Sequence, residues 1–210
     1  MYEIYFYKDK NGKEPLIDYL TKLYKNKDKD SRIKLNKIQD YIRVLKEYGT
    51  YTGEPYIKHI EGDIWELRPL SDRIFFVTWY KNGFMLLHHF TKKTQKTPTK
   101  EIETAKRRLK ELLERERSKK MSEYTTWDEF EKTIFTPEEI AESKLRVALI
   151  GELIKARNEK GISQKKLEEL SGVKQPIIAR MEKGHTNAQI ETILKILAPL
   201  GKTLAVVPIS

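Results

Sequence analysis

The sequence predicts an α+β domain built on an antiparallel sheet, followed by an all-α helix-turn-helix domain with a short C-terminal strand or tail. The first domain is predicted from residues 64–98, where strand-like segments follow one another and Asn82-Gly83 is typical of a β-hairpin turn. The second is predicted from residues 163–184, in which two short helical patterns flank Gly172. A chain of 210 residues is long enough for two domains of ordinary size.

The remaining elements follow from the spacing of apolar residues. Residues 2–7 alternate as a strand does, and residues 56–60 suit either a short strand or an extended lead-in. Helical spacing predicts five helices outside the helix-turn-helix motif. They cover residues 15–24, 31–48, 101–117, 145–160 and 190–200.

A register can be proposed for the strands of residues 64–98. If Asn82-Gly83 and Ser71-Asp72 are both two-residue turns, Arg73 lies opposite Lys92 and Glu66 lies opposite Val77. Polar residues then share one face of the sheet, namely Glu66, Arg68, Arg73, His88 and Lys92. An apolar set suited to packing against helices occupies the other face, namely Trp65, Leu67, Ile74, Phe76, Met85 and Leu87.

Charge is divided unevenly along the chain. Residues 1–120 hold 28 Lys and Arg against 18 Asp and Glu, a balance of +10, whereas residues 121–210 hold 13 of each kind. Such an excess attracts polyanions, although a basic surface also serves solubility alone. With no Cys and four scattered His, the sequence predicts no disulfide, no metal site and no cofactor. No apolar stretch approaches about 20 residues, so we expect a cytoplasmic protein without membrane contact.

Residues 163–184 form the most specific motif in the chain. Ser163 suits a helix N-cap and Gly172 suits the turn. Gln164 begins the helix before the turn, and Lys174-Gln175 begin the helix after it. Helix-turn-helix units also occur as plain folding units, but this pattern favours DNA binding. The predicted DNA-binding residues are Gln164, Lys174, Gln175 and Arg180. Because one recognition helix covers few base pairs, we expect a homodimer to form through this domain.

Both halves of the chain have a family resemblance. In the first half it rests on Trp65-Glu66-Leu67-Arg68, Arg73, Leu86-Leu87-His88, Phe90 and residues 92–98. These residues resemble the HigB (host-inhibition-of-growth) toxins, in the phage-derived branch of the RelE superfamily of mRNA interferases. Residues 145–200 are similar to the phage-repressor-like HigA antitoxins, although Pro176 stands where that family often has a polar, base-contacting residue. The resemblance implies a RelE-like ribonuclease that cleaves mRNA on the translating ribosome, and an antitoxin that binds operator DNA.

The polar face of the predicted sheet suits the cleavage of RNA without a metal. That reaction requires activation of a 2′-hydroxyl, stabilisation of negative charge and protonation of the leaving oxygen. The predicted catalytic residues are Arg68, Arg73, His88, Lys92 and Lys93. Arg68 and Arg73 would clamp the phosphate, and Lys92 and Lys93 would hold it. Lys92 is also a candidate base, because nearby arginines make its proton easier to lose. His88, oriented by Glu66, would act as acid or base. Each residue also has an ordinary explanation as a cross-strand ion pair, a buried histidine or a solvated tail.

Met121 marks the predicted boundary between toxin and antitoxin. Residues 1–120 would form the toxin, residues 121–144 an acidic segment that contacts it, and residues 145–210 the antitoxin's DNA-binding domain. The predicted contact residues are Trp127, Phe130, Ile134 and Phe135. The segment would either cover the catalytic arginines or clasp the two N-terminal helices and block ribosome entry. The aromatic side chains favour the second mode, because they suit a groove between helices.

These expectations together describe a toxin–antitoxin pair in one polypeptide, with an endoribonuclease neutralised by an antitoxin that represses its own operon. Two alternatives stay open. In the first alternative, residues 1–120 are a non-enzymatic RNA- or ribosome-binding module paired with a DNA-binding domain. In the second, they are a sensing or dimerising module of a transcription regulator. Cleavage of ribosome-bound mRNA by residues 1–120 distinguishes the three.

Overall fold

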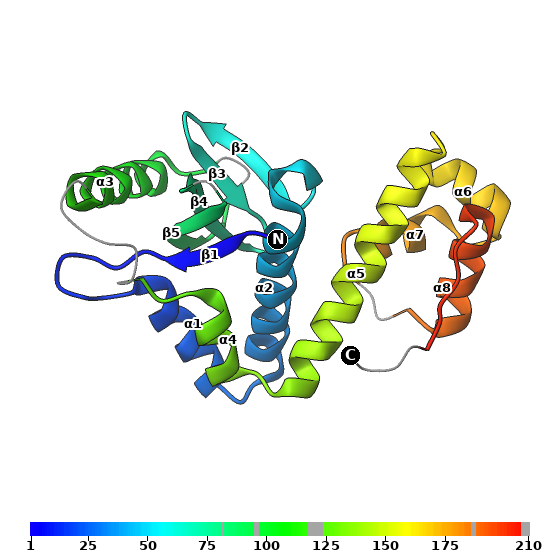
Figure 1. Ribbon diagram of the computed structural model, residues 1–210, viewed down its shortest axis with the longest axis horizontal. Coiled ribbons are helices and arrows are strands. Elements are labelled where there is room, and N and C mark those ends of the chain that lie inside the picture. The colour runs from blue at the N-terminus through cyan, green and yellow to red at the C-terminus, as the bar shows by residue number, and fades with distance from the viewer. Residues whose placement is uncertain (81, 95–96, 117–123, 186–187, 207–210) are drawn as a thin grey trace. The chain divides into compact units, whose positions relative to one another are not determined.

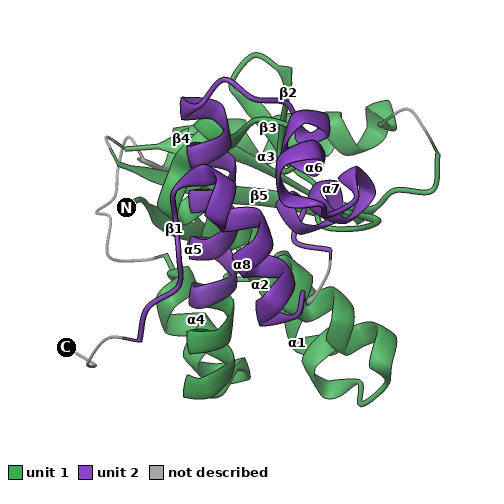
Figure 2. Ribbon diagram, turned by 90° about the vertical axis from the view of Figure 1, so that its right-hand side faces the viewer, with its two compact units in different colours: residues 1–143 green, residues 144–210 purple. Residues whose placement is uncertain are grey.

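A computed structural model of the protein describes residues 1–80, 82–94, 97–116, 124–185 and 188–206 (Figure 1). The chain divides into two compact units, residues 1–143 and 144–210 (Figure 2). Unit 1 contains a five-stranded sheet with helices, and the described part of unit 2 is helical. The predicted fold class is therefore confirmed. No helix among the described residues is long and apolar enough to cross a bilayer.

Unit 1 consists of one sheet and the helices that pack against it. The strands are β1 (Glu3–Phe6), β2 (Ile57–Glu61), β3 (Ile64–Leu67), β4 (Asp72–Trp79) and β5 (Gly83–Thr91). The helices are α1 (Pro15–Lys25), α2 (Lys29–Tyr48), the 3-10 turn η1 (Gly49–Thr52), α3 (Thr99–Glu116), α4 (Trp127–Ile134) and the start of α5 (Pro137–Glu159). Residues 56–60, for which two readings were open, contribute to a strand.

The sheet is mixed, with the strand order β1-β5-β4-β3-β2. β1 runs parallel to β5, and every other neighbouring pair is antiparallel. Helix α3 lies over one face, and α1 and α2 lie over the other (Figure 1). The core on the α3 side contains Phe75, Val77 and Met85, while Ile74 and Phe76 are equally buried on the opposite side. The expectation that one face is core and the other carries charge is therefore wrong.

The turn between β3 and β4 lies one residue earlier than predicted. The backbone N–H of Asp72 donates to the carbonyl of Pro69 at 2.9 Å, and Leu70 between them has a positive φ of 52°. Asp72 is therefore the first residue of β4 and not part of the turn. The shift moves the pairing by two positions, so that Glu66 lies opposite Phe75 and not opposite Val77.

The pairing of β4 with β5 also differs from the predicted register. Arg73 lies opposite Phe90 and not opposite Lys92, and a bulge follows Phe75. The bulge inserts one extra residue in β5 and reverses the alternation of faces beyond it. As a result Met85 and Leu87, predicted on the face opposite the polar residues, lie in the core beneath α3.

Gly83 explains why Asn82-Gly83 is not the centre of a two-residue turn. Gly83 is already paired with Trp79 in the sheet. A Cβ at this position would lie 3.0 Å from the carbonyl oxygen of Glu3 and 3.0 Å from a ring carbon of Tyr5. The missing side chain therefore lets β1 pack closely along β5, and Asn82 reinforces that contact by accepting from the Glu3 N–H at 3.0 Å.

Unit 2 is built from the rest of α5 and from α6 (Gln164–Ser171), α7 (Gln175–Glu182), α8 (Ile190–Leu197) and the 3-10 turn η3 (Ala198–Leu200). Ser163 caps α6 by accepting from the Lys166 N–H at 3.1 Å, and Gly172 ends it with a φ of 71°. Leu153, Leu167 and Ile178 belong to one buried cluster that joins these helices. Residues 202–206 form no strand, and residues 207–210 of the predicted tail lie outside the described part.

Candidate functional site

Three of the five predicted catalytic residues surround one buried carboxylate. Glu66, on β3, is 1% exposed, and its Oε1 lies 3.5 Å from Nε of Arg68 and 3.4 Å from Nε of Arg73. Its other oxygen accepts from the Thr97 hydroxyl at 3.2 Å. Lys92, just after β5, is close enough for Glu66 and both arginines to shift its pKa. We call Glu66, Arg68, Arg73 and Lys92 the basic cluster.

The two arginines of the basic cluster keep unused hydrogen-bond donors. Nη1 of Arg73 donates to the carbonyls of Leu70 and Asp72, at 2.8 and 2.6 Å. The Nε atoms of Arg68 and Arg73 are buried without a hydrogen-bond partner among the described residues, although both lie near Glu66 Oε1. Buried donors without partners are rare in proteins because they cost free energy. Both Nε atoms face Glu66, so an incoming oxyanion would meet the exposed part of the two arginine side chains, which are 24% exposed for Arg68 and 11% for Arg73.

Burial and neighbouring cations make Lys92 a more acidic ammonium than usual. Partial desolvation lowers the pKa of Lys92, and the positive charges of Arg73, Arg68 and Lys58 lower it further, while Glu66 acts in the opposite direction. Lys58, on β2, pairs directly opposite Glu66. The sequence did not identify Lys58, because residues 56–60 suited either a strand or an extended lead-in. The pairing of β2 with β3 identifies it.

Tyr41 is a second residue that sequence analysis missed beside the basic cluster. It belongs to α2 and is 2% exposed, and its ring centroid lies 4.8 Å from that of Tyr56. Burial raises the pKa of Tyr41 to about 12, while the charges of Arg73 and Arg68 act in the opposite direction. Helix α2 therefore brings a phenol next to the two arginines.

His88 lies in a separate hydrogen-bonded group. Its Nε2 is 2.6 Å from a carboxylate oxygen of Glu101, and its Nδ1 is 3.1 Å from Nη1 of Arg108. Arginine only donates, so Nδ1 accepts and Nε2 carries the proton that is donated to Glu101. The expectation that Glu66 orients His88 is therefore wrong, because Glu101 and Arg108 of α3 orient it.

The electrostatic surroundings keep His88 neutral. Desolvation lowers the pKa of His88, the hydrogen bond to Glu101 opposes this, and the charge of Arg108 lowers it again. Glu101, Ala105 and Arg108 follow one another at helical spacing on the face of α3 that meets the sheet. The spacing of Glu101, Ala105 and Arg108 could have placed the two charged residues on the sheet-facing side of α3. The sequence analysis used only apolar residues to define that side.

Lys93 is exposed, unlike the other predicted catalytic residues. It follows Lys92 outside β5, and residues 95–96 of the same basic run lie outside the described part of the chain. The structure thus joins Arg68, Arg73 and Lys92 in one cluster, pairs His88 of β5 with residues of α3 instead, and leaves Lys93 at the surface.

Residues 124–143 pack as part of unit 1. The backbone N–H of Phe6 donates to the carbonyl of Thr125 at 3.0 Å, and Thr126 forms an antiparallel bridge with Tyr5. This short stretch covers the outer edge of β1, which would otherwise present unpaired backbone groups. Thr126 then begins α4 through a capping box with Glu129.

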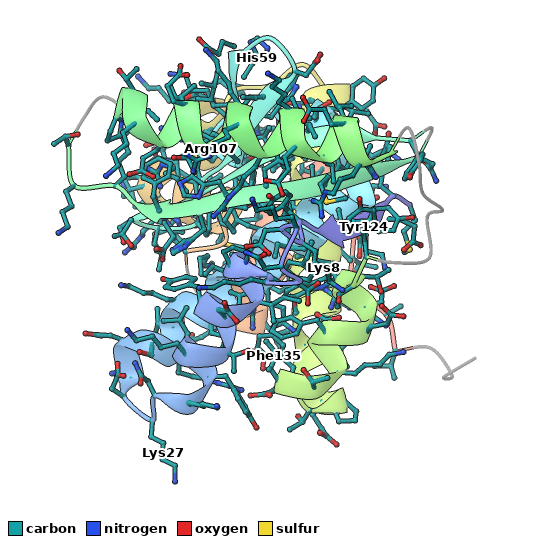
Figure 3. All side chains as sticks on the ribbon, turned by 90° about the vertical axis from the view of Figure 1, so that its left-hand side faces the viewer. Lys8, Lys27, His59, Arg107, Tyr124 and Phe135 are labelled. Atoms are coloured by element: carbon teal, nitrogen blue, oxygen red, sulfur yellow. The ribbon has the colours of Figure 1, made fainter. Side chains whose placement is uncertain are left out.

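The four predicted contact residues of this segment are all buried. Exposure is 1% for Trp127, 7% for Phe130, 5% for Ile134 and 5% for Phe135. The ring centroid of Phe6, on β1, lies 6.2 Å from that of Trp127 and 5.4 Å from that of Phe130. The guanidinium of Arg32 lies 5.5 Å from the ring centroid of Phe135, which Figure 3 labels. The contacts thus reach both β1 and α2.

Charged residues of the segment pair with α2. Glu131 is 4% exposed and accepts from Arg43 at 2.5 Å and from Gln39 at 2.9 Å. Arg43 also donates to the hydroxyl of Ser143, which in turn donates to Asp40 at 2.9 Å. Further ion pairs join Lys46 to Asp128 and Arg32 to Glu139. These contacts fall on α2, whereas the arginines of the basic cluster belong to β3, β4 and their turns.

A second polar network lies in the helix-turn-helix motif. Arg157, on α5, pairs with the buried Glu182 at 2.6 Å, and Glu182 accepts from Gln164 at 2.7 Å. Gln164 in turn accepts from the side-chain amide of Gln175 at 2.8 Å. The network places the starts of α6 and α7 side by side and fixes the Gln175 amide. In the part of the chain that the structure describes, its carbonyl oxygen and second N–H have no partner, so they suit a base edge.

The other two predicted DNA-binding residues lie at the surface of unit 2. The side chain of Lys174 is 79% exposed and lies 3.3 Å from Glu168. Arg180 is exposed on α7. The four residues thus come from the N-terminal end of α6 and from α7 with the residue that precedes it, as a recognition surface requires.

Comparisons with known proteins agree with this division. Residues 25–110 match the family described as "Phage derived protein Gp49-like (DUF891)", and residues 153–207 match the family described as "Helix-turn-helix". The phage-derived first part and the helix-turn-helix second part expected from the sequence are thereby confirmed.

Individual proteins are also similar to part of the chain. A solved structure described as a toxin–antitoxin module from Streptococcus pneumoniae is 64% identical, with a TM-score of 0.37, over 40% of this chain and 94% of that one. An uncharacterized HTH-type transcriptional regulator of Haemophilus influenzae is 68% identical over 85 residues, which are 40% of this chain and 87% of the relative. The chain therefore belongs to the family of HTH-type transcriptional regulators and carries a phage-derived Gp49-like domain in addition.

Proposed function

We propose that the chain is a type II toxin–antitoxin system in one polypeptide, with a HigB-type endoribonuclease in residues 1–120 and a HigA-type antitoxin in residues 121–210. The observation that carries the proposal is the basic cluster, in which two partly exposed arginines and Lys92 gather around one buried carboxylate. Its net positive charge and its place in the Gp49-like region favour a phosphate of RNA as the ligand. The resemblance to HigB makes mRNA on the ribosome the proposed substrate.

The basic cluster has the groups that metal-independent RNA cleavage needs. Attack of the 2′-oxygen on the adjacent phosphorus forms a phosphorane with extra negative charge, which Arg68 and Arg73 stabilise. Lys92, with its lowered pKa, removes the proton of the 2′-hydroxyl. The bond to the 5′-oxygen breaks, and that oxygen takes a proton from a cationic neighbour or from water. Among the described residues no three His, Asp or Glu side chains are grouped to hold a metal ion.

One observation favours a different function for unit 1. Both ring nitrogens of His88 are already engaged, by Glu101 and by Arg108, so His88 reaches a substrate only if one of these hydrogen bonds opens. In the alternative, unit 1 binds RNA or the ribosome without cleaving RNA. The His88 group then serves only to join β5 to α3.

The antitoxin function is proposed from the contacts of residues 124–143. Their aromatic and charged side chains pack on β1 and α2, and this favours obstruction of ribosome entry over direct covering of the basic cluster. The DNA-binding function is proposed from the pre-positioned glutamines of unit 2. A homodimer would place two such surfaces on one operator and repress the operon.

Replacing Arg73 tests the proposed catalytic site. Arg73→Ala in residues 1–120 should lower cleavage of ribosome-bound mRNA by roughly 100-fold or more, because a donor to the transition-state charge is lost. Arg107→Ala, at an exposed position of α3, is the matched control and should leave cleavage unchanged. Cleavage by the Arg73 variant at the parent rate, with normal circular dichroism, would place the site elsewhere.

The pH dependence of cleavage tests the role of Lys92. A general base acts only when deprotonated, so the single-turnover rate should rise with pH until the lowered pKa of Lys92 is passed, and then level off. Lys92→Arg keeps the positive charge but cannot lose its proton near neutral pH, so that variant should lose this rising limb. An unchanged pH profile in Lys92→Arg contradicts the assignment.

Deleting the acidic segment tests neutralisation. Residues 1–120 are co-expressed with an antitoxin that lacks residues 121–144, and growth and co-purification are measured. We expect growth arrest and loss of the complex, because the buried aromatic contacts with Phe6 and the Glu131 pair are removed. If the shortened antitoxin still binds and neutralises fully, inhibition comes from the helix-turn-helix body and the segment is a tether.

Alanine substitutions in unit 2 test operator recognition. Gln175→Ala should reduce discrimination between operator and unrelated DNA by about 1–3 kcal/mol, because a positioned amide reads one base pair. Lys174→Ala should weaken binding to both DNAs alike, since an exposed lysine contacts phosphate. Gel-shift titrations on both DNAs measure these effects, and unaltered discrimination in the Gln175→Ala/Arg180→Ala double variant removes the assignment.

A further inference from the structure

Exposed lysines gather at the end of the α1–α2 hairpin. They are Lys22 and Lys25 of α1, Lys27 in the turn, and Lys29 of α2. Figure 3 shows Lys27 extending from unit 1 at the end remote from α3. Within the described ranges, none of the four forms an ion pair. We call this group the hairpin lysines.

Lys106 and Lys110 of α3 differ from the hairpin lysines in this respect. Lys106 pairs with Glu61 and, at 3.2 Å, with Glu103, and Lys110 lies 4.0 Å from Glu114. Near the hairpin lysines, Asp28 uses its carboxylate to cap α2, accepting from the Ser31 N–H at 2.8 Å. Among the described residues, the hairpin lysines thus lack the ion pairs that Lys106 and Lys110 form, although Asp28 and Asp30 flank Lys29 in the chain.

Helix stability explains only part of this pattern. Lys22 and Lys25 lie in the last turn of α1, where a cation is favourable for the helix dipole. Lys29 is the first residue of α2, where a cation opposes the dipole. Its charge thus opposes the helix dipole, although Asp28 and Asp30 lie on either side of it in the chain, and a further anion bound there would stabilise it.

Two large apolar side chains are exposed beside the hairpin lysines. Tyr24, in the last turn of α1, is 47% exposed, and Ile33, in the second turn of α2, is 46% exposed. An aromatic ring among lysines is the combination that binds single-stranded nucleic acid, because bases stack on the ring while lysines contact phosphates. Two apolar side chains are too few to anchor the hairpin in a lipid surface.

We propose that the end of the α1–α2 hairpin binds the backbone of an RNA strand, with Tyr24 stacking on an unpaired base. This inference rests on the proposed function, in which unit 1 acts on RNA, and adds an RNA-binding surface outside the basic cluster. The lysines neutralise phosphates and release their counterions, so the contact contributes affinity that falls with salt. Stacking on Tyr24 adds binding affinity that depends little on the salt concentration.

The acidic segment reaches the same hairpin. Arg32, one turn after Lys29, is paired with Glu139 and lies against the ring of Phe135. Glu138, next in the chain to Glu139, is exposed. Negative charge from the segment at this side of the hairpin weakens the attraction for an incoming phosphate backbone without occupying the hairpin lysines. The proposed surface thus gives the segment a way to inhibit without contact with the basic cluster.

Salt-dependent RNA binding by the full chain tests the hairpin lysines. A labelled oligouridylate of about 16 nucleotides is titrated by fluorescence anisotropy between roughly 50 and 200 mM salt. All proteins carry Gln175→Ala and Arg180→Ala, which weakens binding by unit 2. Lys25→Gln/Lys27→Gln should reduce the slope of log K against log salt by about 1.4, which is two phosphate contacts. Lys106→Gln/Lys110→Gln removes the same charge from α3 and should leave the slope unchanged.

Two further results decide the proposal. Tyr24→Ala should weaken binding at least about fivefold with little change in slope, and Tyr24→Phe should restore it, because stacking needs only the ring. Equal slopes for the hairpin and α3 variants, or full affinity in Tyr24→Ala, overturn the hairpin surface. The Arg73→Ala cleavage assay is independent of these binding measurements. If it contradicts the ribonuclease proposal, the RNA-binding result still stands. If the binding measurements contradict the hairpin surface, the ribonuclease proposal still stands.

Discussion

The buried pairing of a carboxylate with a guanidinium recurs at each functional part of this protein. Glu66, Glu131 and Glu182 are 1%, 4% and 5% exposed, and each lies beside at least one arginine from another part of the chain. A buried charge is tolerated only when it is paired, and removing one partner of such a pair costs about 3–5 kcal/mol. Each pair therefore fixes two segments in one arrangement, and each arrangement presents the functional groups around it.

The three pairs differ in how completely the carboxylate is satisfied. Glu131 accepts short hydrogen bonds from Arg43 and Gln39, and Glu182 accepts from Arg157 and Gln164, as expected where the pair joins helices permanently. Glu66 lies near two guanidinium Nε atoms without accepting a hydrogen bond from either. The basic cluster is thus held in place by longer ion pairs, and the exposed part of both arginines stays open to the proposed phosphate.

The helices α1 and α2 connect the proposed toxin site with its proposed inhibitor. One part of α2 carries Arg43 and Lys46, which pair with residues 124–143, and another carries Tyr41, next to the arginines of the basic cluster. The hairpin that joins the two helices carries the exposed lysines. Under the proposed function, a segment that packs on these helices would therefore affect how RNA approaches unit 1 without entering the basic cluster.

Local signals in the sequence, namely apolar periodicity, capping residues and clustered cations, predicted the fold class, the order of most helices and strands and the helix-turn-helix motif, and they placed Arg68, Arg73 and Lys92 in one group. Tertiary structure decided the rest. A turn displaced to Leu70, a bulge after Phe75 and a glycine used for close packing changed the register, and no local pattern specifies which residues will pair across strands. For the same reason Lys58, and the partners of His88 on α3, became visible only when distant segments were brought together.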